Sequence, residues 1–297
     1  MSDSAALKDK APRWAKDLAN AGTRRYALAT VRSRPMPDYL VLGTKRGGTT
    51  SLHRYLLMHP DVRGLFPEVR GVKSTDYFFE NYSRGDLWYR SHFQGDRARR
   101  RHQARTGQRL VGGESSPFYM WDPRIAARVR RSAPHVRGIM LLRDPVTRAW
   151  SHYQERLGNG MEPLGFREAL DAESERLAGE LDLMQADPDF HSVAYDFYSY
   201  RARGVYLPQI RNWLTSFPAD QLLVLQSEQL YADTQTVFDT VTNFLGLRRF
   251  ELPDATVFNA SGGPRMPEDV REELRAFYKP RNAELESFLG RPLGWDG

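Results

Sequence analysis

The 297-residue chain contains no cysteine, which excludes disulfide bonds and thiolate metal sites. No run of 18 apolar residues occurs, so no segment is predicted to span a membrane. The amino terminus carries an early aspartate, Asp3, and lacks the long apolar core of a secretory signal. These absences favour a cytoplasmic protein.

Internal repeats, low-complexity linkers and charge blocks that would divide the chain are also missing. Because 40% of the residues are hydrophobic, the chain can bury one large core, and we predict one domain over residues 36–297. Residues 1–35 are basic and place Trp14 and Leu18 four positions apart. We expect this segment to be either a poorly ordered arm or a helix on the core or on an anionic membrane surface, which would allow peripheral membrane contact.

Positive charge exceeds negative charge, with a formal net charge of +6. Arginines are concentrated between Arg97 and Arg109, just before an apolar run that begins at Leu110. We interpret this stretch as a solvated connector, with contact to nucleic acid or an acidic glycan as the alternative. No nucleic-acid partner is expected.

Short apolar runs alternate with segments of helical spacing along most of the chain. This alternation is typical of an α/β domain in which helices flank a central parallel sheet. The predicted strands are 39–43, 110–113, 137–142 and 221–226. The predicted helices are 49–59, 123–132, 145–157, 205–217, 233–246 and 268–289.

The stretch from 38 to 59 combines a buried strand, a glycine-rich loop and a helix. The loop carries Gly43, Gly47 and Gly48 together with the cations Lys45 and Arg46, and Thr49 and Thr50 open the helix. A strand that enters such a loop at a helix N-terminus forms an anion cradle, because unpaired backbone N–H groups and the helix dipole favour negative charge. We therefore predict a phosphate-binding loop.

This loop differs from the G-x-x-x-x-G-K-[ST] loop of nucleotide kinases. Gly43 and Gly48 have the required separation, but Thr49 occupies the position of the kinase lysine, and the cation stands inside the loop at Lys45. A lysine there lies over the first phosphate and the group attached to it. No apolar strand ending in a magnesium-binding aspartate stands out, so a triphosphate is not favoured.

A second anion site is predicted where the apolar run 139–142 ends in Arg143-Asp144-Pro145. Asp144 suits a helix N-cap and Pro145 the first helical turn, which puts Arg143 at the carboxyl end of a strand. Ser151 lies two turns into the following helix. An arginine and a hydroxyl that converge on one point make a monophosphate clamp.

Together the two motifs resemble those of the sulfotransferases that use 3′-phosphoadenosine 5′-phosphosulfate (PAPS). Their 5′-phosphosulfate loop reads G-x-x-K-x-G-T-T and their 3′-phosphate motif reads R-D-P-x-x-R-x-x-S. This chain matches every fixed position of the second motif, Arg148 included. Further similarity, at 113–119 and 266–295, is to the heparan-type and bacterial branch.

The resemblance implies a single P-loop-like α/β domain with the sulfotransferase fold. It implies PAPS as donor co-substrate, the 3′,5′-bisphosphate PAP as product, and no metal requirement. The predicted donor contacts are Lys45, Arg46, Gly47, Gly48, Thr49, Thr50, Arg143, Ser151 and Arg265. Arg265 belongs to 259–265, which resembles the family's late loop over the nucleotide.

Sulfuryl transfer requires a cation at the leaving group, in-line placement of the acceptor and a base. Lys45 is the predicted cation. The heparan branch carries K-E-x-H-F-F where this chain has Lys73-Ser74-Thr75-Asp76-Tyr77-Phe78, so its glutamate base is absent. The candidate bases are, in order, Asp76, Glu114 and His53, and Lys73 is a candidate to hold the sulfuryl oxygens.

The predicted activity is transfer of a sulfuryl group from PAPS to a hydroxyl or amine. A glycan, lipid or other small molecule fits as acceptor, and the acceptor pocket is expected in variable loops at 61–105 and 158–204. The alternatives are a non-catalytic binder of nucleotide or polyanion and a P-loop nucleotide kinase. The sequence does not predict the oligomeric state.

Overall fold

The structure is a computed structural model that describes residues 22–68, 72–253 and 264–295. Its centre is a parallel sheet in the order β2-β3-β1-β4-β5. The strands are β1 (Tyr39–Gly43), β2 (Val62–Arg63), β3 (Val111–Ser115), β4 (Arg137–Leu142) and β5 (Leu222–Gln226). The expected α/β fold with a central parallel sheet is confirmed.

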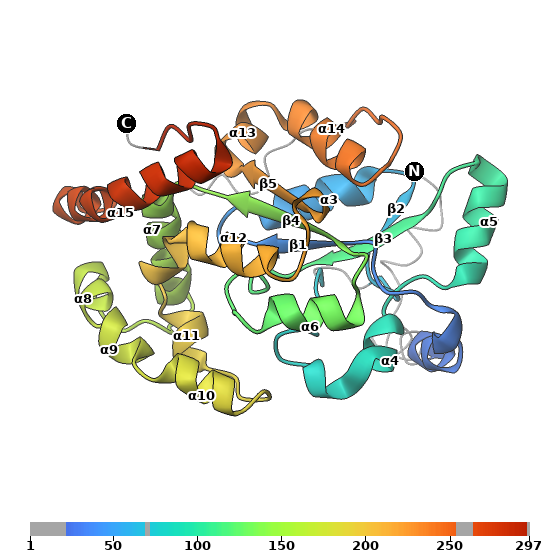
Figure 1. Cartoon of the computed structure of the whole chain (residues 1–297), viewed down its shortest axis with the longest axis horizontal. Helices are drawn as coiled ribbons and strands as arrows, with labels where there is room; N and C mark the ends of the chain where they lie inside the picture. Colours follow the sequence, from blue (N-terminus) through green and yellow to red (C-terminus); the bar gives the residue numbers. More distant parts are fainter. Residues whose placement is uncertain (1–21, 69–71, 254–263, 296–297) are drawn as a thin grey trace.

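Helices pack on both faces of this sheet (Figure 1). Among the helices are α3 (Thr49–Met58), α6 (Ile125–Ser132), α7 (Pro145–Gly158), α12 (Tyr206–Leu214), α14 (Thr234–Phe244) and α15 (Glu268–Leu289). Others are α4 (Gly85–Arg90), α5 (Asp96–Thr106), α8 (Phe166–Asp171), α9 (Glu173–Leu177), α10 (Glu180–Ala186), α11 (Val193–Phe197) and α13 (Ser227–Ala232).

Alternate residues of the buried strands serve the two faces of the sheet. Val41 and Ile139 pack with α3 and α14, whereas Leu40 and Met140 pack with α6 and α12. The central strands β3, β1 and β4 are buried on both sides, as expected for a parallel sheet covered by helices. In Figure 1, α14 and α6 lie on opposite sides of the sheet. The apolar runs in the sequence are therefore strands because both of their faces are covered.

Two segments interpreted as loops contain helices. The arginine-rich stretch is α5 rather than a connector, and it is held to the sheet through Arg99, which pairs with Asp38 at 2.9 Å. Between 158 and 204 the chain forms α8 to α11 and a 3-10 turn. Neither region shows the long apolar periodicity that identified the other helices.

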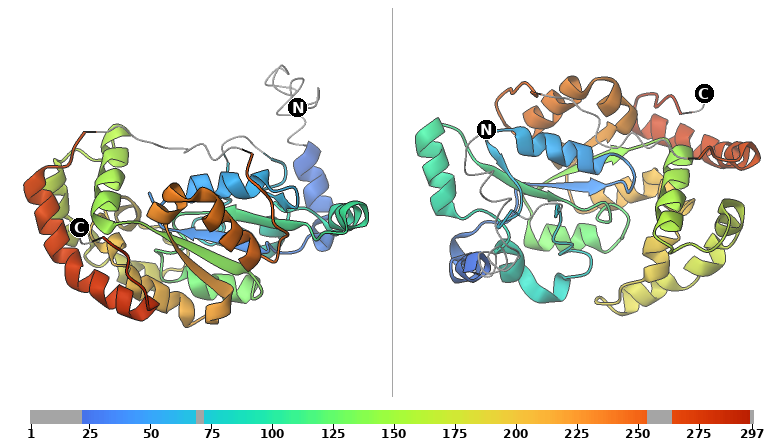
Figure 2. Two further views of the ribbon diagram at one scale, coloured as in Figure 1. Left: turned by 90° about the horizontal axis from the view of Figure 1, so that it is seen from above. Right: turned by 180° about the vertical axis from the view of Figure 1, so that it is seen from behind.

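The described part of the amino-terminal segment is helical over residues 22–29. Arg24 anchors it to the core through bonds to the carbonyls of Phe66 and Ser91 at 3.3 and 3.1 Å. This helix and α5 lie at the end of the molecule remote from α15 (Figures 1 and 2). Residues 1–21, including Trp14 and Leu18, lie outside the described residues.

Candidate active site

The loop after β1 is fixed to the carboxyl ends of β4 and β5. The Thr44 N–H donates to the Leu141 carbonyl at 3.0 Å, and the Ser227 hydroxyl donates to the Gly47 carbonyl at 2.5 Å. A Cβ on Gly47 would stand 2.5 Å from the Leu141 oxygen, and Gly48 has a φ of 86°. Glycines are therefore required where the loop touches β4 and where it enters α3.

One cavity of about 310 Å³ opens above this loop. Its walls include the predicted contacts Lys45, Arg46, Gly48, Thr49, Thr50, Lys73 and Arg143. The other walls are Pro117, Phe118, Glu155 and Tyr231. The structure thus brings both predicted anion motifs, from residues about 100 positions apart, to one cavity at the carboxyl ends of the strands, where open α/β sheets bind ligands.

Arg46 links the two motifs directly. Its Nε donates to the Ser151 hydroxyl at 2.9 Å, and its carbonyl accepts from Arg143 Nη1 at 3.0 Å. Asp144 caps α7 by accepting from Val146 N at 3.1 Å, and this cap fixes the turn that follows Arg143. Arg46, Arg143 and Ser151 also line an adjoining cavity of about 480 Å³ along α7.

Two buried lysines supply positive charge. Burial lowers the pKa of Lys45 to about 8. The carboxylate of Glu155, 3.3 Å from its Nζ, opposes this shift only in part. Burial likewise lowers the pKa of Lys73 to about 8. Lys73 donates to the Thr50 and Thr49 hydroxyls at 2.9 and 3.3 Å. A bound anion would stabilise the charged form of both ammonium groups.

The sequence-based candidate bases do not line this cavity. Glu114 is fully buried and accepts bonds from Thr75, Tyr89 and Tyr119. His53 is 4% exposed, and burial lowers its pKa to about 4, so it is neutral at physiological pH. Asp76 lies close enough to Lys73 to raise the pKa of that lysine, and its Oδ1 accepts from the Ser74 and Ser116 hydroxyls.

Two residues of the predicted donor motifs lie elsewhere. Arg148, in the first turns of α7, is fully buried and donates to the Tyr200 carbonyl instead of lining the cavity. Arg265 is exposed and lines a separate hollow with Asp144 and Trp150. Its predicted loop, 259–265, is described only from Pro264, whose carbonyl accepts from Trp150 Nε1 at 3.0 Å.

Sequence reasoning missed Glu155, Phe118 and Tyr231. Glu155 follows Ser151 by four residues, so both lie on the same face of α7, and this spacing was the available signal. Its carboxylate lies 3.3 Å from Lys45 and 3.4 Å from Arg46. The cavity therefore contains a carboxylate that pairs with two of the predicted donor-binding cations.

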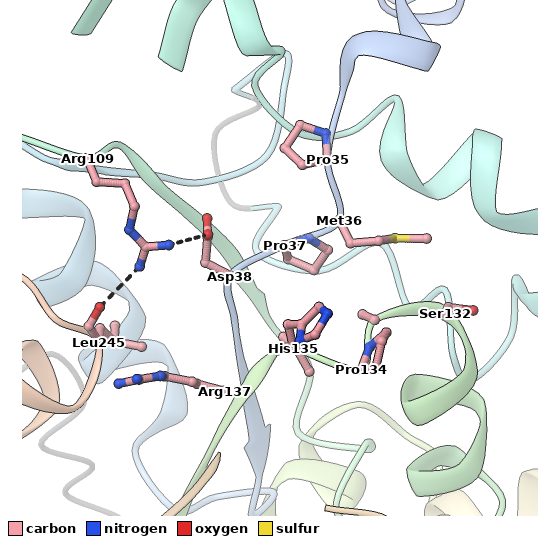
Figure 3. A pocket seen from close by; sticks show the side chains of 12 residues that line it. Pro35, Met36, Pro37, Asp38, Arg109, Ser132, Pro134, His135, Arg137 and Leu245 are labelled. Atoms are coloured by element: carbon pink, nitrogen blue, oxygen red, sulfur yellow. Dashed lines mark hydrogen bonds and ion pairs between the residues drawn. The ribbon is translucent and has the colours of Figure 1, made fainter. Parts of the chain in front are cut away.

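A larger cavity, of about 600 Å³, lies at the opposite ends of the strands. Figure 3 shows Arg109 between Asp38 and the Leu245 carbonyl, with Arg137 and three prolines nearby. Asp38 immediately precedes β1 and Arg137 begins β4, so this hollow is at the amino ends. It is remote from the phosphate loop and is not a donor site for the motifs described above.

Comparison with known proteins assigns the family. The family model for the sulfotransferase domain matches residues 36–260, and the chain belongs to this family. It is 30% identical over 288 residues to the mouse heparan sulfate glucosamine 3-O-sulfotransferase 6, covering 89% of this chain and 75% of that protein. The heparan sulfate glucosamine 3-O-sulfotransferases 3A1 and 3B1 of mouse and human are each 28% identical to this chain, which spans about two thirds of their length.

A solved bacterial structure has the same fold. The crystal structure of a sulfotransferase from Alicyclobacillus acidocaldarius superposes with a TM-score of 0.64 at 29% identity. The match covers 88% of this chain and 99% of that one. The resemblance inferred from the two phosphate motifs is confirmed at the level of family and fold.

Proposed function

We propose that the protein transfers a sulfuryl group from PAPS to a hydroxyl or amine of a small-molecule, lipid or glycan acceptor by in-line displacement. One observation carries the proposal: Lys45 and Arg143, from separate motifs, line a single cavity at the carboxyl ends of parallel strands. The relatives are named as sulfotransferases, and several act on heparan sulfate.

In this proposal the loop and the first turn of α3 bind the 5′-phosphosulfate, while Arg143 and Ser151 bind the 3′-phosphate. Lys45 stabilises charge on the leaving phosphate oxygen. At 4 Å and an effective dielectric constant of about 20, one such charge contributes about 4 kcal/mol. Lys73, beside Thr49 and Thr50, binds the sulfuryl oxygens. Asp76 remains the base predicted from sequence.

Thermal shift with PAP and with ATP plus magnesium tests the nucleotide. We expect PAP to stabilise the protein without added metal, and turnover of PAPS to persist in a chelator. If ATP with magnesium stabilises the protein and PAP does not, the result would support the kinase alternative. PAP binding without transfer to any acceptor of a broad hydroxyl and amine panel would support the non-catalytic binder.

We also propose a cytoplasmic location and peripheral contact with anionic membranes through the basic amino-terminal segment. On the helix at 22–29, Tyr26 and Leu28 are about half exposed, and Arg25 and Arg32 are exposed beside them. Apolar and basic side chains presented together favour adsorption to an anionic lipid surface. No helix in the described ranges is long and apolar enough to cross a membrane.

A further inference from the structure

Glu155 is the one carboxylate among the described residues that line the cavity of the proposed donor. It also lines the adjoining cavity along α7, so it stands where the two hollows meet. A general base must come within hydrogen-bond reach of the acceptor proton, either directly or through one water. Position in the cavity is therefore the first requirement, and Glu155 meets it.

Asp76 and Glu114 accept hydrogen bonds from residues that do not line the cavity. One oxygen of Asp76 accepts from two serine hydroxyls, at 2.8 Å from Ser74 and 2.7 Å from Ser116. Glu114 is fully enclosed, and its two oxygens accept from the Thr75 N–H and hydroxyl and from the Tyr89 and Tyr119 hydroxyls. Neither carboxyl group lines the described cavity.

Unlike the partners of Asp76 and Glu114, the partners of Glu155 line the cavity, so the proposed donor would compete for them. Lys45 Nζ lies 3.3 Å from Oε1 and Arg46 Nη1 lies 3.4 Å from Oε2. The other cations that line this cavity in the described structure are Lys73 and Arg143. A phosphosulfate in the cradle would take over Lys45 and Arg46, which leaves the carboxylate free to accept a proton beside the reacting group.

We propose that Glu155, rather than Asp76, is the general base of the transfer; this inference rests on the proposed function. The acceptor hydroxyl gives its proton to the Glu155 carboxylate while its oxygen forms the new O–S bond. The bond from sulfur to the bridging oxygen breaks, and its electron pair stays on the 5′-phosphate of PAP, beside the Lys45 ammonium. Release of the proton to water restores Glu155.

The test compares Glu155→Gln with Asp76→Asn and with the control Glu284→Gln, an exposed carboxylate on α15. Transfer is followed with radiolabelled PAPS, both to water and to the best acceptor of a hydroxyl panel, across pH. PAP affinity is measured in parallel. Loss of a positioned base lowers rates by about 100- to 10,000-fold.

We expect Glu155→Gln to lose transfer by this factor, to lose the acid limb of the pH profile, and to bind PAP as tightly as the wild type or more tightly. A merely structural role in holding Lys45 would instead weaken PAP binding. Asp76→Asn should reduce transfer less than tenfold. Near-normal transfer by Glu155→Gln, or an unchanged acid limb, overturns the assignment.

The two proposals fail in different ways. If the wild-type protein is not stabilised by PAP, the proposed function fails and the role of Glu155 falls with it. If the wild type binds PAP and transfers sulfate, but Asp76→Asn alone abolishes transfer, only the assignment of Glu155 is wrong. Normal behaviour of Glu284→Gln shows that loss of one surface charge does not account for the effects.

Discussion

At the scale of residues, the cavity buries two ammonium groups, those of Lys45 and Lys73. Their carboxylate neighbours do not offset the lowering of their pKa by desolvation. The pKa of Lys45 and that of Lys73 are both lowered to about 8 because burial outweighs their acidic neighbours. Anionic oxygens of a bound nucleotide would favour the protonated forms. Ligand binding and proton binding should therefore be coupled at mildly alkaline pH.

We predict that PAP binding takes up protons between about pH 7 and 9 and weakens as pH rises through this range. Below about pH 7 both lysines are already largely charged, so the uptake should fade. Calorimetry in buffers of different ionisation enthalpy measures the uptake. Lys45→Arg, whose guanidinium stays charged, should reduce it; equal uptake in this variant would contradict the role of Lys45.

A second prediction concerns Glu114, whose pKa burial raises to about 7. Because the folded value lies above the unfolded one, its stabilising contribution is complete below about pH 4.5 and is lost as pH rises to about 7, by about 3 kcal/mol. Glu114→Gln should flatten this part of the thermal-unfolding profile against pH. A profile parallel to that of wild type would contradict it.

Sequence alone predicted the two cationic motifs because each has a fixed spacing within a few residues. It did not predict Glu155, since the partners Lys45 and Arg46 are about 110 positions away and meet it only after folding. It also could not show that Glu114 is enclosed by two tyrosines, or that Arg148 is fully buried. Such contacts depend on tertiary packing, which local patterns do not encode.

At the scale of elements, the loop after β1 works because it is held by backbone contacts. Arg46 adopts a φ of 68°, an uncommon conformation for a residue with a side chain. Bonds from Ser227 to Gly47 and from Thr44 to Leu141 hold the loop. The loop backbone is thus held in this conformation by β4 and by the first residue of α13.

Gly47→Ala should therefore weaken PAP binding. Its Cβ would stand 2.5 Å from the Leu141 oxygen, and the loop would have to move away from β4. Overpacking of this kind costs about 1–3 kcal/mol. Calorimetric titration with PAP measures the affinity, and thermal unfolding measures stability. Gly22→Ala, where nothing lies within 4 Å, is the control; equal affinities in the two variants would contradict the argument.

The sequence predicted a strand where both of its faces are apolar, and a helix where one stripe of its surface is clearly apolar. The strand predicted at 137–142 is β4 (Arg137–Leu142), and the helix predicted at 268–289 is α15 (Glu268–Leu289). In contrast, α5 buries only His102, which bonds to Asp61 at 2.8 Å, so no apolar period marks it. Short α8 to α11 are likewise stabilised by packing rather than by a strong local pattern.

At the scale of the whole molecule, positive charge gathers at the end remote from α15. In α5, Arg97, Arg101 and Arg105 stand at four-residue intervals and are exposed. This helix begins beside Ser33, which follows the helix at 22–29. The cavity above the β1 loop is at the carboxyl ends of the strands, whereas Arg109 lines the hollow at their amino ends (Figure 3).

We predict that Arg25→Gln with Arg32→Gln weakens binding of the full chain to anionic phosphatidylglycerol vesicles by about 30-fold, because each basic residue near such a surface contributes about 1 kcal/mol. Neutral phosphatidylcholine vesicles should bind neither protein. Arg211→Gln with Lys279→Gln, on α12 and α15, removes the same charge elsewhere. Equal losses in the two double variants, measured by co-sedimentation, would contradict a localised membrane surface.

The contacts of Arg46 bear on which nucleotides can bind. This side chain touches Ser151 and Glu155, while its carbonyl accepts from Arg143, so the regions proposed to bind the two phosphates share one residue. A ligand that carries only a 5′ group must break the ion pair between Arg46 and Glu155. It does not gain the contacts of a 3′-phosphate with Arg143 and Ser151 in return. Adenosine 5′-phosphosulfate should consequently bind more weakly than PAPS by more than the contribution of one phosphate contact. The site would therefore select a ribose substituted at both the 3′ and the 5′ position.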